Sequence, residues 1–199
     1  MFNENIKNLL ENIKKPEEPE NMTLVCEGGA FLGAYQNGAL QVVREMERQN
    51  YVNVNRVSGV SVGSLNAFMY CIDRLEILSE TINIIKDDIR EHYQITKIKD
   101  ILTDIINNID DDIFDSLQNK LYITYYSLDT CEQVVCSTFE TRQKLVEALL
   151  HSCNIPLLMK YNSTSEINTF DGITPFIFPQ KPQELSLIHI SEPTRREGI

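Results

Sequence analysis

The chain has 199 residues, of which 42% are hydrophobic and 24% charged, and its formal net charge is -11. That length fits one domain with at most a small appendage, and the hydrophobic fraction is sufficient for a buried core. The negative charge argues against nucleic acid as a partner and against purely electrostatic attachment to anionic lipid, but it leaves open an apolar groove that takes up lipid.

The sequence has no features of a secreted or membrane-spanning chain. It contains no run of about 18 apolar residues, so no membrane-spanning helix is expected. Residues 1–5 lack the basic and apolar segments of a secretory signal. The five cysteines form an odd, scattered set that is typical of reduced thiols. A cytoplasmic location is therefore predicted, with contact at a membrane surface left open.

Residues 2–15 predict an amphipathic helix. Its apolar residues recur at helical spacing: Ile6, Leu9, Leu10 and Ile13. A charged, proline-containing linker over residues 15–20 ends the helix. Residues 1–20 are therefore expected to form a peripheral helix and linker, and a membrane or partner contact through this helix is the alternative.

A glycine-rich turn at residues 27–33 joins a short buried strand to a helix. The apolar face expected on that helix consists of Tyr35, Ala39, Val42, Val43 and Met46. Such a turn exposes successive backbone N–H groups, which can hold an anion. A dinucleotide site is disfavoured because Gly28-x-Ala30-x-x-Gly33 lacks the second glycine. An oxyanion cradle and a tight turn without a ligand both remain.

Gly59-x-Ser61-x-Gly63 lies at the next junction of a strand and a helix. Residues 54–60 predict a buried strand, and the chain from Leu65 onward predicts a helix. The glycines remove side chains that would collide in a sharp turn, so the pattern predicts a nucleophile elbow. The Ser61 hydroxyl would then lie at the positive end of a helix. An ordinary Gly/Ser turn is the alternative.

The middle of the chain is predicted to be helical from residue 75 to residue 117. The acidic run at residues 110–112 lacks the glycine and the terminal glutamate of an EF-hand, so a solvated helix face or turn is expected. Residues 121–128 and 133–136 then predict two strands of a hairpin.

Ser137-x-x-Glu140 predicts the capping box of a helix that runs through His151. Cys131 and Cys136 have no second closely spaced pair, so incidental thiols are expected and no metal site. Asp171-Gly172 follows a short strand-like run, and such acid–glycine pairs are common in turns.

Residues 185–199 are abnormal and resemble the translation of a sequencing adapter. They are expected to be non-native, so His189 is left out of the functional interpretation. The natural chain is then expected to continue beyond about residue 184, and the domain over residues 21–184 to be incomplete.

Three motifs in order carry a family resemblance: the glycine-rich turn, the serine elbow at Ser61 and the Asp171-Gly172 pair. Together they resemble the patatin-like phospholipase family over roughly residues 22–178. Residues 151–156 also look like the small-residue and proline stretch of that family. The resemblance implies an α/β fold whose central, mostly parallel sheet is flanked by helices.

The resemblance also implies a serine lipid acyl hydrolase, a phospholipase A or esterase, with a Ser–Asp dyad and no cofactor. Ser61 would attack the ester carbonyl, and Asp171 would accept its proton. The oxyanion would be held by the backbone N–H groups of Gly28, Gly29 and Ala30. The expected partner is a lipid or phospholipid ester.

Histidines and departures from the family pattern refine this expectation. Only His92 and His151 precede the abnormal tail, and both precede Asp171, which disfavours a Ser–acid–His triad. Each is expected at a surface or a helix end. Ala30 replaces the third glycine of the family, Leu32 its basic residue, and Ile173 a small residue. These departures leave open a degenerate lipid-binding protein. An acyltransferase is also open, because an acyl-enzyme can pass its acyl group to an acceptor other than water.

Overall fold

The computed structural model describes residues 2–156, 158–160, 168–179 and 186–190. Within these ranges one sheet has the strand order β4-β3-β2-β1-β6, and β5 also pairs with β3. Strands β1, β2, β3 and β6 are parallel, whereas β4 and β5 are antiparallel to β3. The strands are β1 (Glu20–Cys26), β2 (Val52–Val60), β3 (Leu121–Ser127), β4 (Glu132–Cys136), β5 (Thr169–Asp171) and β6 (Ser186–Ile190).

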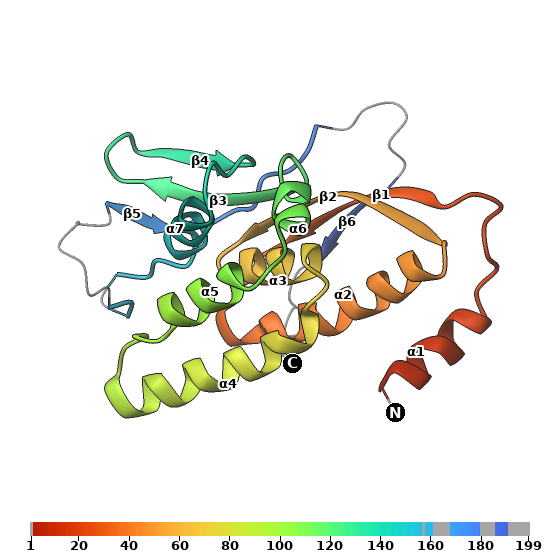
Figure 1. Ribbon diagram of the computed structural model, residues 1–199, viewed down its shortest axis with the longest axis horizontal. Coiled ribbons are helices and arrows are strands. Elements are labelled where there is room, and N and C mark those ends of the chain that lie inside the picture. Colours follow the sequence, from red (N-terminus) through yellow and green to blue (C-terminus); the bar gives the residue numbers. More distant parts are fainter. Residues whose placement is uncertain (1, 157, 161–167, 180–185, 191–199) are drawn as a thin grey trace, which may run out of the picture.

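Helices flank this sheet, and α2 to α5 lie together along one side of it (Figure 1). The expected α/β fold with a central, mostly parallel sheet is therefore confirmed. The helices are α1 (Phe2–Glu11), the short 3-10 helix η1 (Ala30–Leu32), α2 (Gly33–Arg48), α3 (Val62–Cys71), α4 (Leu75–His92), α5 (Ile98–Asn107), α6 (Asp111–Ser116) and α7 (Arg142–Ser152).

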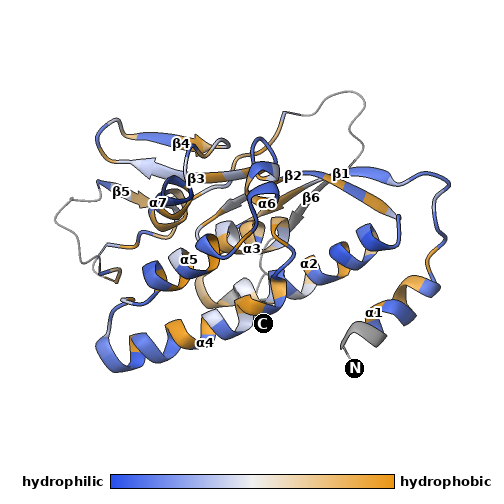
Figure 2. Cartoon of the chain, viewed as in Figure 1, coloured by the Kyte–Doolittle hydropathy of each residue, from blue (hydrophilic) through white to orange (hydrophobic). Residues whose placement is uncertain are grey.

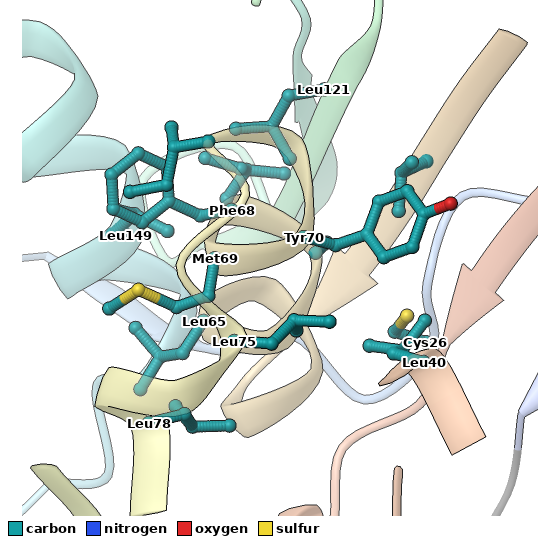
Figure 3. Close-up of a cluster of buried hydrophobic side chains, with 14 of the residues drawn as sticks. Cys26, Leu40, Leu65, Phe68, Met69, Tyr70, Leu75, Leu78, Leu121 and Leu149 are labelled. Carbon is teal, nitrogen blue, oxygen red and sulfur yellow. The ribbon is translucent and has the colours of Figure 1, made fainter. Parts of the chain in front are cut away.

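Helix α3 is the centre of the core. All its residues up to Tyr70 are buried, because strands β1, β2 and β3 and helices α2, α4 and α7 all contact it. Figure 3 shows Phe68 and Met69 of this helix among leucines from the surrounding elements, including Leu78 and Leu149. A helix that is buried on every side has no face left for solvent, so its position in the fold is fixed by packing.

Helix α1 confirms the predicted amphipathic segment, although it ends at Glu11. Ile6 and Leu10 are buried, whereas Leu9 and Ile13 are 53% and 43% exposed. The Tyr51 hydroxyl donates to the carbonyl oxygen of Leu10 at 3.1 Å, which ties the helix to the start of β2. In Figure 2, apolar and polar residues are interspersed along α4 and α5, as expected for helices with one buried side.

The stretch predicted as helical from 75 to 117 is divided into α4, α5 and α6. Asp88, fully buried in α4, accepts hydrogen bonds from the backbone N–H groups of Thr96 at 2.5 Å and Lys97 at 3.0 Å. Burial would raise the pKa of Asp88, but these bonds outweigh it and hold the pKa below the ordinary value. A buried carboxylate thus shapes the turn between α4 and α5. The spacing of apolar residues in the sequence could not predict this turn.

Two local predictions were wrong. Helix α7 is capped by Thr141, whose hydroxyl accepts from the Lys144 N–H at 3.2 Å, and not by the predicted box at Ser137 and Glu140. On α2 the buried residues are Gly33, Gln36, Asn37, Leu40 and Val43. The predicted face included Tyr35, which is 64% exposed. The prediction was therefore wrong at Tyr35 and Ala39, because the inward face of α2 carries two amides there, whereas Val43 is buried as predicted.

The C-terminal strand β6 pairs with β1 inside the segment predicted to be non-native. This pairing does not test that prediction, because an unpaired strand edge offers hydrogen bonds to any extended segment. Residue 185 and residues 191–199 lie outside the described residues. In the part of the chain that the structure describes, no helix combines the length and the apolar composition needed to cross a bilayer.

Candidate active site

Ser61 occupies a sharp turn between β2 and α3, with φ 55° and ψ -133°. A Cβ added to Gly59 would lie 2.3 Å from the carbonyl oxygen of Gly63, and one added to Gly63 would lie 2.3 Å from that of Glu27. Both positions therefore require glycine, and the turn has the geometry of a nucleophile elbow. Because α3 begins at the next residue, the Ser61 hydroxyl lies at the positive end of that helix.

Neighbouring hydroxyls hold the strained backbone of Ser61 in place. The Ser61 N–H donates to Ser152 Oγ at 2.9 Å, and Ser152 Oγ donates to the carbonyl oxygen of Thr124 at 2.7 Å. On the other side, Ser64 Oγ donates to the carbonyl oxygen of Ser61 at 2.6 Å. Such surroundings are what a sparsely populated backbone conformation needs in order to persist.

Strand β3 brings Asp171 to this turn. β2 pairs with β3 up to Val60 opposite Thr124, and β5 then pairs with the next part of β3, with Asp171 opposite Tyr125. Since β4 occupies the other edge of β3 along these residues, β5 must continue on the edge that β2 leaves. The end of β5 therefore lies beside the end of β2, and Ser61 Oγ donates to Asp171 Oδ2 at 2.6 Å.

The Asp171 side chain is half-buried. Its second oxygen, Oδ1, is buried and has no hydrogen-bond partner among the described residues. Burial raises the pKa of Asp171 from 3.8 to about 6, and the hydrogen bond from Ser61 partly offsets this rise. A carboxylate with this pKa is a stronger base than an ordinary aspartate and is still ionised at neutral pH.

Gly172 allows β5 to approach so closely. A Cβ at this position would lie 2.4 Å from Val60 Cγ2 and 2.7 Å from the carbonyl oxygen of Thr124. The acid–glycine pair therefore has a specific steric reason here, because the glycine lets the backbone beside Asp171 pack on β2 and β3.

The glycine-rich turn lies directly against Ser61. A Cβ on Gly28 would lie 3.3 Å from Ser61 Cβ and 3.9 Å from Ser61 Oγ. Gly29 has φ 156° and ψ 20°, which glycine adopts far more readily than other residues, and Ala30 has φ 46°. Outside helices and strands, no backbone–backbone hydrogen bond among the described residues uses the N–H groups of Gly28, Gly29 or Ala30. These amides remain available to an anion beside Ser61.

An apolar pocket opens from Ser61. Its empty volume is about 570 Å³, including space open to solvent. Helix α4, the start of α5 and the chain from Cys153 to Met159 supply most of its wall, and Phe31, 41% exposed, also lines it. The isoleucines on the wall are Ile82, Ile85, Ile89, Ile95, Ile98 and Ile155. The apolar lining of the pocket suits an acyl chain and not a charged ligand.

The two histidines lie in the last turns of their helices, as predicted. His92 Nδ1 lies 3.0 Å from Asp88 Oδ1 at the end of α4. The His151 ring packs 5.0 Å from the ring of Tyr125, and burial lowers the pKa of His151. Ser61 is thus hydrogen-bonded to a carboxylate and not to either imidazole. Among the described residues, no group of three or more His, Cys, Asp or Glu is placed to hold a metal ion.

The structure thus brings all the predicted site residues together: Ser61, Asp171, Gly28, Gly29, Ala30, Gly59 and Gly63. Of the three departures, Ala30 has a positive φ and Ile173 is 74% exposed. The Leu32 side chain lies outside what the structure describes. Sequence reasoning did not find Ser152, which holds the Ser61 N–H, although it lies in the recognised stretch at 151–156.

Comparison with known proteins gives a match to the family model of patatin-like phospholipase over residues 24–176. Omega-hydroxyceramide transacylases of Mus musculus and Homo sapiens are 22% and 23% identical to the chain over 152 and 149 residues. Each alignment covers 71% of this chain but only 24% and 28% of the relatives. The chain therefore spans about a quarter of the length of these relatives.

Ala30→Gly is expected to stabilise the protein. The left-handed φ of 46° costs alanine about 1–2 kcal/mol, and the greater freedom of glycine in the unfolded chain offsets part of the gain. We expect the free energy of unfolding in urea to rise by about 1 kcal/mol. The control is Ala39→Gly in the regular helix α2, which should lower it by a similar amount. A loss of stability in Ala30→Gly would contradict the strain at this position.

Asp171→Asn is expected to change how stability depends on pH. The folded-state pKa of about 6 lies above the ordinary 3.8, so the folded protein binds a proton that the unfolded chain has released over this interval. The stability of the parent therefore falls as pH rises from 3.8 to about 6, and the asparagine variant avoids this loss.

Urea unfolding at several pH values measures this effect. The free energy of unfolding of the variant, relative to that of the parent, should increase up to about pH 6 and stay constant above it. Asp112→Asn, an exposed aspartate on α6, serves as the control. If the variant instead becomes less stable relative to the parent as pH rises, a raised pKa at Asp171 is excluded.

Proposed function

Because the chain belongs to the patatin-like phospholipase family, we propose that it is a serine lipid acyl hydrolase of the phospholipase A or esterase type. The hydrogen bond of 2.6 Å from Ser61 Oγ to Asp171 Oδ2 is the observation that carries this proposal. Such a bond joins a nucleophile to a base within the distance that proton transfer requires. Its position at the end of an apolar pocket supports a substrate with an acyl chain.

In the proposed first step, Asp171 Oδ2 takes the hydroxyl proton as Ser61 Oγ forms a bond to the ester carbonyl carbon. The negative charge that develops on the carbonyl oxygen is stabilised by the N–H groups of Gly28, Gly29 and Ala30 and by the N-terminus of α3. The ester C–O bond then breaks, and the leaving alcohol takes the proton from Asp171. The result is an acyl group covalently bound to Ser61.

In the second step a water molecule gives a proton to Asp171 while its oxygen attacks the acyl carbon. The bond from that carbon to Ser61 Oγ breaks, Ser61 regains its proton from Asp171, and a fatty acid leaves. The raised pKa of about 6 favours both transfers, because it brings the basicity of the carboxylate closer to the working pH.

The positions of the pocket residues suggest an orientation for the substrate. The acyl chain would pack among the isoleucines of α4 and α5, with its carbonyl at Ser61. Burial of each CH₂ group is worth about 0.8 kcal/mol, so chain length would control affinity. Phe31 of η1 and Tyr35 at the start of α2, which are 41% and 64% exposed, would contact the surface of a lipid aggregate. The proposed partners are therefore lipid or phospholipid esters, with peripheral membrane contact.

Ser61→Ala and Asp171→Asn are expected to lower kcat on p-nitrophenyl butyrate by about 10²–10⁴-fold, because each removes one partner of the proton transfer. In the parent, kcat/KM should rise with pH through about 6 and then level off, since Asp171 must be ionised to act as a base. Initial rates across this range, with a phospholipid as second substrate, measure both effects.

Matched controls for these variants are Ser116→Ala and Asp112→Asn, exposed residues of α6 that should retain full activity. Retained activity in Ser61→Ala or Asp171→Asn would overturn the dyad. A folded parent that neither hydrolyses esters nor reacts at Ser61 with a fluorophosphonate probe would favour the alternative of a degenerate lipid-binding protein.

An acyltransferase is the second candidate, because both relatives are named transacylases. The first step would be the same, and an alcohol would replace water in the second. We expect free butyrate to remain the main product when a low concentration of 1-butanol is added to the p-nitrophenyl butyrate assay. Gas chromatography of the products measures the partition, and Ser61→Ala gives the background. Predominant butyl butyrate would make transfer the principal activity.

A further inference from the structure

Two buried amide side chains hold the glycine-rich loop at both of its ends. Gln36 of α2 and Asn66 of α3 are 2% and 0% exposed. Gln36 Nε2 donates to the carbonyl oxygen of Glu27 at 2.7 Å, where the loop begins. Asn66 Nδ2 donates to the carbonyl oxygen of Gly33 at 3.1 Å, where the loop joins α2.

The two amides are also bonded to each other. Asn66 Nδ2 donates to Gln36 Oε1 at 3.0 Å. A primary amide nitrogen has two N–H donors, so Asn66 uses both of them in this network. Asn66 Oδ1 is buried without a hydrogen-bond partner among the described residues, which is unfavourable for a polar atom. The two hydrogen bonds that Asn66 Nδ2 donates are therefore the reason for an asparagine at this position.

We propose that Gln36 and Asn66 are positioning residues that fix the loop amides relative to the Ser61 hydroxyl. Asn66 lies on α3, the helix that begins immediately after Ser61, so the network joins the loop to the element that carries the nucleophile. The kinetic part of this inference rests on the proposed hydrolase function. The structural part concerns the loop alone.

The loop needs such restraint because its own backbone disfavours its conformation. Gly29 has φ 156° and Ala30 has φ 46°, and the N–H groups of neither take part in a backbone–backbone hydrogen bond outside helices and strands. Without external bonds, loop amides in such conformations would relax to others. Stabilisation of an oxyanion requires donors placed before the reaction, so the two amides would contribute to catalysis without touching the substrate.

Asn37 provides an internal comparison. It follows Gln36 on α2, is 3% exposed, and donates from Nδ2 to the carbonyl oxygen of Leu75 at 2.8 Å. The chemistry and the burial match those of Asn66, but the bond joins α2 to the start of α4 and does not reach the loop. A purely structural role for buried amides would make Asn37 and Asn66 equivalent.

The test compares Gln36→Met and Asn66→Leu with the control Asn37→Leu, all in the full chain. We expect the first two to lower kcat on p-nitrophenyl butyrate by about 10–100-fold with KM changed less than about twofold, because misplaced donors affect the transition state most. The control should keep kcat within about threefold, although urea unfolding shows a comparable loss of stability.

Backbone ¹⁵N relaxation of Gly28, Gly29 and Ala30 measures the order of the loop without reference to activity, and it requires no hydrogen bond at these amides. The order parameters there should fall in Gln36→Met and Asn66→Leu and not in Asn37→Leu. If Asn66→Leu does not fold, Gln36→Met decides the outcome, because α2 is less deeply enclosed than α3.

Unchanged order parameters in the loop, or an equal fall in the control, would overturn the inference. So would lower order parameters in the loop of Gln36→Met and Asn66→Leu with kcat unchanged from that of an active parent. A parent that neither hydrolyses esters nor reacts with a fluorophosphonate would refute the proposed function instead, and the relaxation data would still decide whether the two amides hold the loop.

Discussion

The edge of β3 is shared by two strands, and the site depends on that arrangement. β2 uses the first part of the edge and turns away at Ser61, and β5 takes the remainder with Asp171 at its end. Two side chains that are 110 positions apart in sequence therefore meet by sheet pairing and not by a flexible loop. Gly172 makes the approach possible, since a side chain there would collide with Val60 and with the backbone of Thr124.

Around this junction, several parts of the chain are held together by small residues. Gly28 contacts Ser61, Gly33 contacts Val62, and Gly63 lies against the backbone of Glu27. A methyl group at Gly33 or Gly63 would collide with its neighbour and one at Gly28 would crowd Ser61, so the first loop, the elbow and helix α3 pack closely only because these residues are glycines. The burial of α3 on every side then transmits the rigidity of the core to Ser61, the proposed nucleophile before its first turn.

The sequence predicted the features that depend on local pattern or on a motif. Glycines around Ser61 predicted the elbow because the steric reason is local, and the order of three motifs predicted the family and its fold. Apolar spacing wrongly placed Tyr35 and Ala39 on the inward face of α2, where Gln36 and Asn37 lie instead, and it missed Asp88 at the turn between α4 and α5. Buried polar groups owe their positions to distant partners, so no window of neighbouring residues could identify them. The isoleucine wall of the pocket has the same origin, since α4, α5 and the chain after α7 assemble it only in three dimensions.

Strand β5 consists of three residues, and it alone presents Asp171 to Ser61. So short a strand has few ladder bonds of its own, whereas α3 and the parallel strands share the main core. Regions with little support open at lower free energy than the body of a domain. Heating would therefore detach Asp171 from Ser61 before it melts the scaffold, so the thermal limit of the proposed hydrolysis would lie below the unfolding temperature of the protein. A longer β5 would bring these two temperatures closer together. Selection for activity at high temperature would therefore be expected to lengthen this strand.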